Sequence, residues 1–240
     1  MFSTFFKKLS SPFKKSGNFF FEIQRITQVP PKNISFYELA FRHSSASKES
    51  NGTKYNNQRL EYLGDAILGA IVADYLYQAY PDSDEGFLTN MRSKIVSRKH
   101  LNQLGIDLGL NKLVVKKTSK TVQAKSIYGD ALEALVGALY LDRGYQACQT
   151  FVSRAIMVDH VDLQRLESRV SSHKGALLEW GQKTKTSILF EITGCWGKSH
   201  SRKYQVSLKV DGQLVATGSG SSKKKAEEEA SKLAYGSIVN

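Results

Sequence analysis

A long apolar segment that contains two acidic residues places the strongest constraint on how this chain can fold. Along residues 58–77, large apolar side chains recur at intervals of three and four, which predicts a helix with one buried face. They are Leu60, Leu63, Ile67, Ile71 and Tyr75. Glu61 and Asp65 lie four residues apart in the same segment and therefore share one face of the predicted helix. Burying two like charges is costly unless something neutralises them, and Arg59 points to a different side.

A second segment repeats this design. Residues 126–141 are apolar and helical in pattern, yet they contain Asp130 and Glu133, three residues apart on one face. If the two helices pack together, four carboxylates meet with little positive charge nearby. A hard divalent cation such as Mg²⁺, which binds oxygen ligands, would resolve that repulsion. The alternative is that each acid forms its own hydrogen bonds at a helix end or at the surface.

Both acidic segments resemble motifs of the ribonuclease III family. Residues 58–68 read Gln-Arg-Leu-Glu-Tyr-Leu-Gly-Asp-Ala-Ile-Leu, where the family usually has Glu-Arg-Leu-Glu-Phe-Leu-Gly-Asp. Residues 130–138, Asp-Ala-Leu-Glu-Ala-Leu-Val-Gly-Ala, are similar to the second acidic motif of that family. Between them, residues 84–86 (Asp-Glu-Gly) and 91–93 (Met-Arg-Ser) also match. With the C-terminal segment, the resemblance covers about residues 21–240 and implies an all-α catalytic domain.

The resemblance also implies a metal site and assigns residues to it. Glu61, Asp65, Asp130 and Glu133 would hold Mg²⁺, with Mn²⁺ as a substitute, and Asp65 and Glu133 would be the most critical for catalysis. The metal would activate water, position the scissile phosphate and stabilise the leaving 3′-oxygen, and two ions would serve both oxygens. No residue has the surroundings of a covalent nucleophile, and no organic cofactor is expected. Glu85 matches a family glutamate near the active site, although an acid at a helix start needs no further explanation.

Gln58 is the main departure from the family pattern. The family usually has Glu at this position, near the scissile phosphate and not as a principal metal ligand. Gln keeps the capacity for hydrogen bonds and loses the charge. We therefore predict that the chain retains cleavage with an altered rate or site choice, and Gln58→Glu should change one of the two.

Composition limits the cellular setting and the class of partner. The chain has 240 residues and a net charge of +12, which favours a polyanionic partner, although solubility alone could also explain it. No run of about 18 apolar residues is present, so no membrane association is expected. Cys148 and Cys195 are too few and too isolated for a disulfide framework or a zinc site, which favours a reducing cytoplasm.

Capping residues and turns predict the local structure of the catalytic region. Asn33 or Ser35 should begin a short helix, and Asp82 or Ser83 should begin a later one. The polar residues 47–57 predict a loop. Basic residues near the later helix could meet phosphates; these are Arg92, Lys94, Arg98 and Lys99.

Two further local predictions concern His43 and Gly144. His43 is a lone histidine, and we interpret it as a loop or packing residue because hard cations prefer oxygen ligands. The helix that contains Glu133 should continue past Gly144 to about residue 156.

The C-terminal seventy residues predict a small α+β domain with the order α-β-β-β-α. Ser172 should cap the first helix, and Asp211-Gly212 predicts the hairpin between the second and third strands. The predicted strands are residues 189–193, 203–210 and 213–217. Ser222 should cap the last helix.

Three lysines at the start of that last helix point to a phosphate-binding surface. Lys223, Lys224 and Lys225 oppose the helix macrodipole, whereas their side chains and the free amides there favour phosphate oxygens. Residues 218–227 resemble the double-stranded-RNA-binding domain, whose last helix starts Gly-x-Gly-x-Ser-Lys-Lys-x-Ala-Glu. A solvated face is the alternative.

The same resemblance makes His200, in the loop after the first strand, and Gln182, on the first helix, expected RNA contacts. Such domains recognise the shape of A-form RNA, its 2′-hydroxyls and its phosphates. Leu178 and Gly175 stand where the family usually offers Gln and Thr, so part of the first-helix contact is missing.

We divide the chain into a basic tail rich in Phe and Lys, a catalytic domain, a helix end with a linker, and the RNA-binding domain. Their bounds are residues 1–20, 21–147, 148–170 and 171–239. The tail should be poorly ordered, with a contact to RNA or to a membrane surface as alternatives.

The combined pattern predicts a cytoplasmic, Mg²⁺-dependent endoribonuclease for double-stranded RNA. The resemblance implies a homodimer that leaves 5′-phosphate and 3′-hydroxyl ends with short 3′ overhangs, and that processes rRNA, mRNA and other structured precursors. The alternative is a non-catalytic double-stranded-RNA-binding scaffold on the same fold, although all four acids are present. A generic metal-dependent phosphohydrolase fits less well, because of the C-terminal domain.

Overall fold

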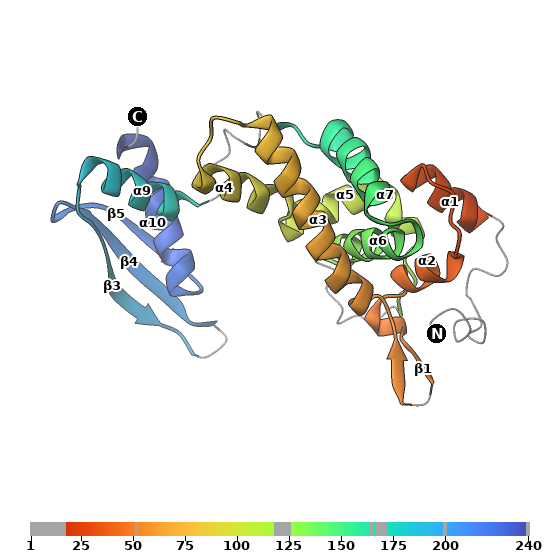
Figure 1. The fold of residues 1–240 in the computed structure, drawn as a ribbon. Helices are drawn as coiled ribbons and strands as arrows, with labels where there is room; N and C mark the ends of the chain where they lie inside the picture. Colours follow the sequence, from red (N-terminus) through yellow and green to blue (C-terminus); the bar gives the residue numbers. More distant parts are fainter. Residues whose placement is uncertain are drawn as a thin grey trace. The chain divides into compact units, whose positions relative to one another are not determined.

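The computed structural model describes residues 18–50, 52–117, 126–163, 166, 172–198 and 201–238. The chain divides into two compact units, Met1–Leu166 and Glu167–Asn240, and each is described by itself (Figure 1). Residues 1–17 of the predicted N-terminal tail, and residues 164, 165 and 167–170 of the predicted helix end and linker, lie outside the described residues. Within the described residues, no helix has the length and apolar character needed to cross a membrane.

The first unit is built mainly of helices, as predicted. Its α-helices are α1 (Asn18–Thr27), α2 (Ile34–Ala40), α3 (Gln58–Ala79), α4 (Glu85–Ile95), α5 (Arg98–Asp107), α6 (Ile127–Arg143) and α7 (Tyr145–Val152). Its described residues also include two short 3₁₀ turns, η2 (Ser44–Ala46) and η3 (Leu110–Lys112), and a π-helical turn, η4 (Ser153–Val158). The predicted loop at residues 47–57 is wrong, because β1 (Lys48–Ser50) and β2 (Thr53–Tyr55) pair there as an antiparallel hairpin.

Helices α3 and α6 cross in direct backbone contact at the centre of the first unit (Figure 1). A Cβ added to Gly64 would collide with the backbone carbonyl of Glu133, and one added to Gly137 would collide with the carbonyl of Leu60. Only glycine permits so close an approach at these two positions. The crossing therefore fixes the distance between the acidic segments of the two helices.

The buried face of α3 lies about one position away from the predicted stripe. Leu60 and Ile71 are buried as predicted, whereas Leu63, Ile67 and Tyr75 are only half buried. The buried residues are Leu60, Gly64, Leu68, Ile71, Val72 and Leu76. The apolar pattern did not include Gly64, because glycine has no apolar side chain, although Gly64 lies in the contact between α3 and α6.

The predicted helix ends are partly confirmed. The side chain of Asn33 caps α2 by accepting a hydrogen bond from the backbone amide of Ser35. The predicted caps of α4 are wrong, since Asp84 Oδ1 accepts from the Phe87 amide at 2.8 Å. The chain is helical past Gly144 as predicted, although α7 and η4 form separate segments and do not continue α6. Gly144 has φ of 81° and separates α6 from α7, because that backbone conformation ends the helix.

The second unit has the predicted α-β-β-β-α order. It consists of α9 (His173–Thr184), β3 (Ile188–Trp196), β4 (Lys203–Val210), β5 (Gln213–Gly220) and α10 (Lys223–Ile238). The strands form an antiparallel sheet in the order β3-β4-β5, and both helices contribute to a core with Leu208 of β4. Asp211 and Gly212 form the predicted hairpin turn, with φ of 47° and 81°.

Gly218 and Gly220 have a different role from the one predicted. They belong to β5 and do not open the last helix. A Cβ at Gly218 would collide with the backbone of α10 at Ala226 and Ala230. These glycines therefore let the strand pack closely against the helix that carries the lysines.

Candidate metal centre and nucleic-acid interface

Three carboxylates from α3 and α6 converge in the first unit. One carboxylate oxygen each from Glu61, Asp130 and Glu133 lies within 4.8 Å of the other two. All three residues are partly buried. Asp65 lies one turn after Glu61 on α3 and is exposed, outside this close group. The structure therefore brings together three of the four predicted acids and places the fourth beside them. We call Glu61, Asp130 and Glu133 the carboxylate cluster.

The cluster is not neutralised by direct contacts. Among the described residues, the carboxylates of Glu61 and Glu133 have no hydrogen-bond or ion-pair partner. Asp130 accepts a hydrogen bond from Ser126 Oγ at 3.2 Å. The alternative in which each acid is satisfied separately therefore does not describe this site.

Burial and mutual repulsion disfavour the charged forms of these acids. Burial, followed by the charges of Asp65, Glu61 and Asp130, raises the pKa of Glu133 to about 7. Burial and the charge of Asp130 likewise raise the pKa of Glu61. Burial also raises the pKa of Asp130, against the hydrogen bond from Ser126. A site that holds several carboxylates at this cost is suited to a hard cation.

Positive charge reaches the cluster from parts of the chain that are distant in sequence. Arg98, the first residue of α5, acts against the raised pKa values of Glu61, Asp130 and Glu133. His43 does the same for Asp130. The expectation of little nearby positive charge considered only neighbours on the same helix and did not include Arg98 and His43, although neither forms an ion pair with the cluster among the described residues.

His43 also has a local structural role. Its Nδ1 accepts a hydrogen bond from the Ser45 amide at 3.2 Å and caps η2. This contact agrees with its interpretation as a loop residue.

Gln58 and Glu85 lie outside the cluster. Gln58 is the exposed first residue of α3, and its backbone amide donates to Asn56 Oδ1 at 3.0 Å. Glu85 is the exposed first residue of α4, and its Oε1 accepts from Thr89 Oγ1 at 3.0 Å. Neither contact connects these residues to the cluster.

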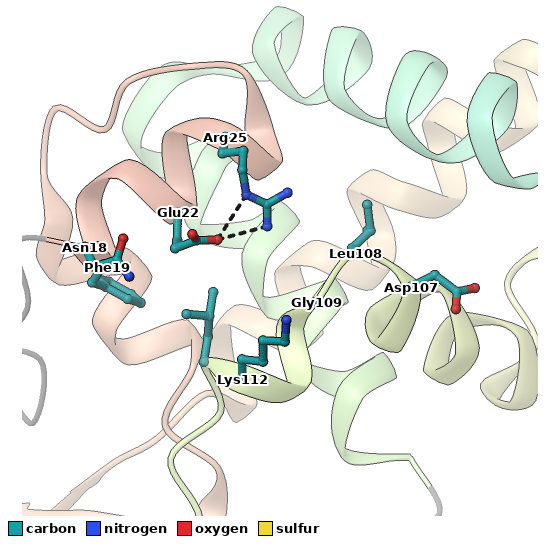
Figure 2. A pocket seen from close by; sticks show the side chains of 9 residues that line it. Asn18, Phe19, Glu22, Arg25, Asp107, Leu108, Gly109 and Lys112 are labelled. Carbon is teal, nitrogen blue, oxygen red and sulfur yellow. Dashed lines mark hydrogen bonds and ion pairs between the residues drawn. The ribbon is translucent and has the colours of Figure 1, made fainter.

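A hollow of about 730 Å³ lies elsewhere, between α1 and the turn after α5 (Figure 2). Its charged lining includes Glu22 and Arg25, which form an ion pair at 2.9 Å, together with Asp107 and Lys112. The charges balance, and no member of the carboxylate cluster lines this hollow. Because this hollow lacks the cluster acids, we do not assign the catalytic site to it.

The second unit exposes several of the predicted RNA contacts. Gln182 is exposed on α9, and Lys223 and Lys224 are exposed in the first turn of α10. Lys225 differs, since its Nζ donates to Ser221 Oγ at 3.1 Å. Ser222 Oγ accepts from the Lys225 amide at 3.3 Å and fulfils its predicted capping role. His200 lies outside the described residues.

Glu228 links the two helices of the second unit, a contact that the sequence analysis missed. Its carboxylate accepts hydrogen bonds from Ser172 Oγ and from the His173 amide, both at 2.7 Å. The Lys174 amide donates to it at 3.4 Å, so Glu228 caps α9 from α10. Although burial raises its pKa, these hydrogen bonds hold the pKa of Glu228 below the ordinary value. An acid one turn after a lysine run gives no sequence signal of this partner.

Comparisons with known proteins agree with both units. A family described as Ribonuclease-III-like matches residues 33–160, and the double-stranded RNA binding motif matches residues 173–237. A protein named Ribonuclease 3 from Zunongwangia profunda is 45% identical, with 97% of this chain and 96% of that protein covered. Ribonuclease 3 from Flavobacterium psychrophilum is 41% identical, with the same shares of 97% and 96% covered.

Solved structures give the same correspondence for the first unit. The nuclease domain of ribonuclease III from Campylobacter jejuni is 29% identical, with a TM-score of 0.52, and the match covers 59% of this chain and 97% of that domain. A second structure of that domain has a TM-score of 0.53 and 29% identity, with 58% and 96% covered. It is described as flexible in a region involved in dimer formation.

Proposed function

The chain belongs to the ribonuclease III family, and from this premise we infer that it is an endoribonuclease that hydrolyses phosphodiester bonds in double-stranded RNA. One observation carries this function: three partly buried carboxylates lie within 4.8 Å of one another, and two of them lack a partner among the described residues. The same chain carries the double-stranded RNA binding motif. A non-catalytic scaffold on this fold would have no need of an unneutralised acidic cluster.

Mg²⁺ fits the donor set of the cluster, and Mn²⁺ should replace it. Glu61, Asp130 and Glu133 offer only carboxylate oxygens, which suit a hard cation. Asp65, exposed one turn after Glu61, would be the fourth ligand. The bound metal would activate water, orient the phosphate and stabilise the leaving oxygen. The protein contributes the spacing, because the glycine crossing of α3 and α6 holds Glu61 against Glu133.

Other residues would bind and orient the RNA. Lys223 and Lys224 are exposed and would bind phosphates at the start of α10, while Gln182 would contact the minor groove. Lys225 and His200 remain predicted contacts of the same unit. Gln58 remains a predicted residue near the scissile phosphate, and Glu85 remains a predicted residue near the active site.

Cleavage of a long perfect RNA duplex tests the proposal. We expect discrete short duplexes in Mg²⁺ and no cleavage in Ca²⁺ or EDTA. The products should carry 5′-phosphate and 3′-hydroxyl ends, with short 3′ overhangs. Single-stranded RNA of the same sequence is the control and should not yield these products. Tight binding of the duplex without cleavage in any metal would favour the scaffold.

A homodimer through α3 is part of the proposal. An apolar stripe of this helix is open to solvent. Tyr62 is 83% exposed, Tyr77 is 72% exposed, and a Cβ added to Gly69 would meet no atom within 4 Å. Ala66 and Ala70 are exposed between them. A patch of this kind is typical of a subunit interface.

A charge introduced into the stripe tests the dimer. Ala70→Arg should convert the dimer to a monomer in sedimentation equilibrium, because an unpaired charge would be buried in the interface. Gln103→Arg, at an exposed position on α5, should leave the dimer intact. A native protein that sediments as a monomer would contradict this part of the proposal.

The setting and substrates complete the proposal. We place the protein in the cytoplasm, in agreement with the free thiols of Cys148 and Cys195, and expect it to process rRNA and other structured precursors. We retain the domain bounds 21–147 and 171–239 for the catalytic and RNA-binding parts.

A further inference from the structure

Trp196 is the last residue of β3, in the sheet of the second unit. It lies opposite Lys203 on β4, and Gly194 lies opposite Gln205. Residues that face each other across two strands, or that are two apart on one strand, share a face of the sheet. Leu208, three residues after Gln205, points to the other face and belongs to the core with the helices. Trp196 therefore stands on the face opposite that core.

Gly194 lets the indole of Trp196 lie against the sheet. A Cβ added to Gly194 would lie 2.9 Å from Cζ3 of Trp196 and 3.3 Å from Oε1 of Gln205. Only glycine leaves room for the ring at this place. The strand thus supports the ring on one side, while Trp196 remains 48% exposed. A planar side chain held in this way loses little further rotamer freedom when it binds a ligand.

The surroundings of Trp196 are basic. Three exposed basic residues stand next to it in the chain or in the strand register: Lys198, Arg202 and Lys203. Glu191 is the one acidic residue of β3, β4 and β5, and its carboxylate forms an ion pair at 2.6 Å with Lys209. An anionic ligand therefore meets no unpaired acid on these strands, and the charge around Trp196 favours a polyanion.

The sheet register places Trp196 at the end of the sheet from which α10 starts. Cys195 of β3, Tyr204 of β4 and Gly220 of β5 form one row across the sheet. Neighbouring strands lie about 4.8 Å apart, so this row spans about 10 Å. Lys223 begins α10 three residues after Gly220. A nucleotide strand that leaves a duplex bound at α10 is therefore within reach of Trp196.

We propose that Trp196, together with Arg202 and Lys203, forms a site for an unpaired nucleotide next to the duplex. This inference rests on the proposed binding of double-stranded RNA. Within a duplex, neighbouring bases cover the base faces, so an indole can stack only on a base that is unpaired or at a helix end. Aromatic side chains among basic residues bind single-stranded nucleic acid by stacking on the bases and by attracting the phosphates. The site therefore favours duplexes with single-stranded extensions over blunt duplexes.

Binding of the full chain to two RNA duplexes in Ca²⁺ tests this proposal. One duplex is blunt, and the other has the same paired region with a short run of unpaired adenosines at both ends. The native protein is compared with Trp196→Ala, with Trp196→Phe, which keeps an aromatic ring, and with Leu214→Ala. Leu214 is 62% exposed on β5, opposite Lys209 and at the far end of the sheet, so it controls for the loss of an exposed apolar side chain.

The extension should raise the affinity of the native protein about tenfold, the effect of stacking one base on an aromatic ring. Trp196→Ala should remove this gain and keep its affinity for the blunt duplex. Trp196→Phe should keep part of the gain, and Leu214→Ala all of it. No gain in the native protein, an unchanged gain in Trp196→Ala, or an equal loss in Leu214→Ala would overturn the proposal. Failure of the native protein to bind the blunt duplex would refute the proposed function itself.

Fluorescence identifies the side chain on which the base stacks. The chain has two tryptophans, and the other one, Trp180, is partly buried on α9. Trp180→Phe leaves Trp196 as the sole indole, and Trp196→Phe leaves Trp180. The extended duplex should quench the emission of Trp180→Phe more strongly than the blunt duplex does, because the stacked base contacts the ring. Quenching that depends on the extension in Trp196→Phe and not in Trp180→Phe would contradict the assignment to Trp196.

Discussion

Two groups of glutamates in this chain have opposite surroundings. In the first unit, Glu61 and Glu133 lie near Asp130 without a direct partner among the described residues. In the second unit, Glu228 accepts hydrogen bonds from Ser172, His173 and Lys174. The difference shows how the two units use their acids. A carboxylate that holds helices together receives donors from the protein, whereas a carboxylate for metal chemistry is left for an external cation.

The pKa values follow the same division. Burial and neighbouring acids raise the pKa of Glu133 to about 7. Hydrogen bonds hold the pKa of Glu228 below its ordinary value, against the effect of burial. The same side chain is therefore destabilised as an anion in one unit and stabilised as an anion in the other.

Removal of the Glu133 charge should have the largest effect. Glu133→Gln should reduce cleavage about 10³-fold, because several kcal/mol of transition-state stabilisation depend on the metal site. Duplex binding in Ca²⁺ and thermal stability should not fall, since the substitution relieves repulsion. Glu49→Gln removes an exposed acid of β1 that has no predicted role at the site, and is the control. If Glu133→Gln lost cleavage because it unfolded, Glu133 would be a structural acid like Glu228, and the difference between the two units would not hold.

Removal of the Glu228 cap should act on stability. Glu228→Ala should destabilise the second unit by about 1–3 kcal/mol, because several donors at the start of α9 lose their acceptor. Hydrogen exchange of α9 amides in the full chain measures the effect. Glu229→Ala, at an exposed neighbouring position, should change the exchange rates of the α9 amides little. Equal exchange in the two variants would show that Glu228 is not a structural acid.

The two units should also respond to pH in opposite directions. The raised pKa of Glu133 means that its contribution to stability is fully present below 4.5 and is lost as the pH rises through about 7. Glu228, whose pKa is lowered, contributes stability above 4.5 that is lost as the pH falls below it. In calorimetry of the metal-free chain, the melting temperature of the first unit should therefore fall as the pH rises toward neutral. The melting temperature of the second unit should fall in acid. Saturating Ca²⁺ should suppress only the first effect.

Substitution of the lysines of α10 should have the smallest effect. The double variant Lys223→Gln with Lys224→Gln should weaken duplex binding about tenfold. The slope of the logarithm of the binding constant against the logarithm of the salt concentration should become shallower by about one per lysine, as lost phosphate contacts predict. Lys232→Gln, exposed later on the same helix, is the control. An unchanged salt dependence would show that the two lysines form only a solvated face.

The sequence predicted the elements of both units better than the contacts between them. The spacing of Glu61, Asp65, Asp130 and Glu133 and the order of the C-terminal elements follow from periodicity, which acts locally. Contacts that join distant segments left no such pattern. Glu228, for example, caps a helix that begins 55 residues earlier.

Glycine residues are the second reason why the structure differs from the sequence-based predictions. The apolar pattern placed the buried stripe of α3 about one position away, because Gly64 carries no hydrophobic signal while it determines the helix crossing. Gly218 resembled part of a helix opening and instead allows β5 to approach α10. In both cases the residue acts by the absence of a side chain, which only the packed structure reveals.

Calorimetric titration of Mn²⁺ into the metal-free protein tests the central claim most directly. Native protein, Glu61→Gln and Glu228→Ala are compared under the same conditions. The account predicts saturable binding in the native protein and in Glu228→Ala, and a strong loss of binding in Glu61→Gln. Equal binding in all three, or no binding in the native protein, would contradict the claim that the carboxylate cluster is a metal site.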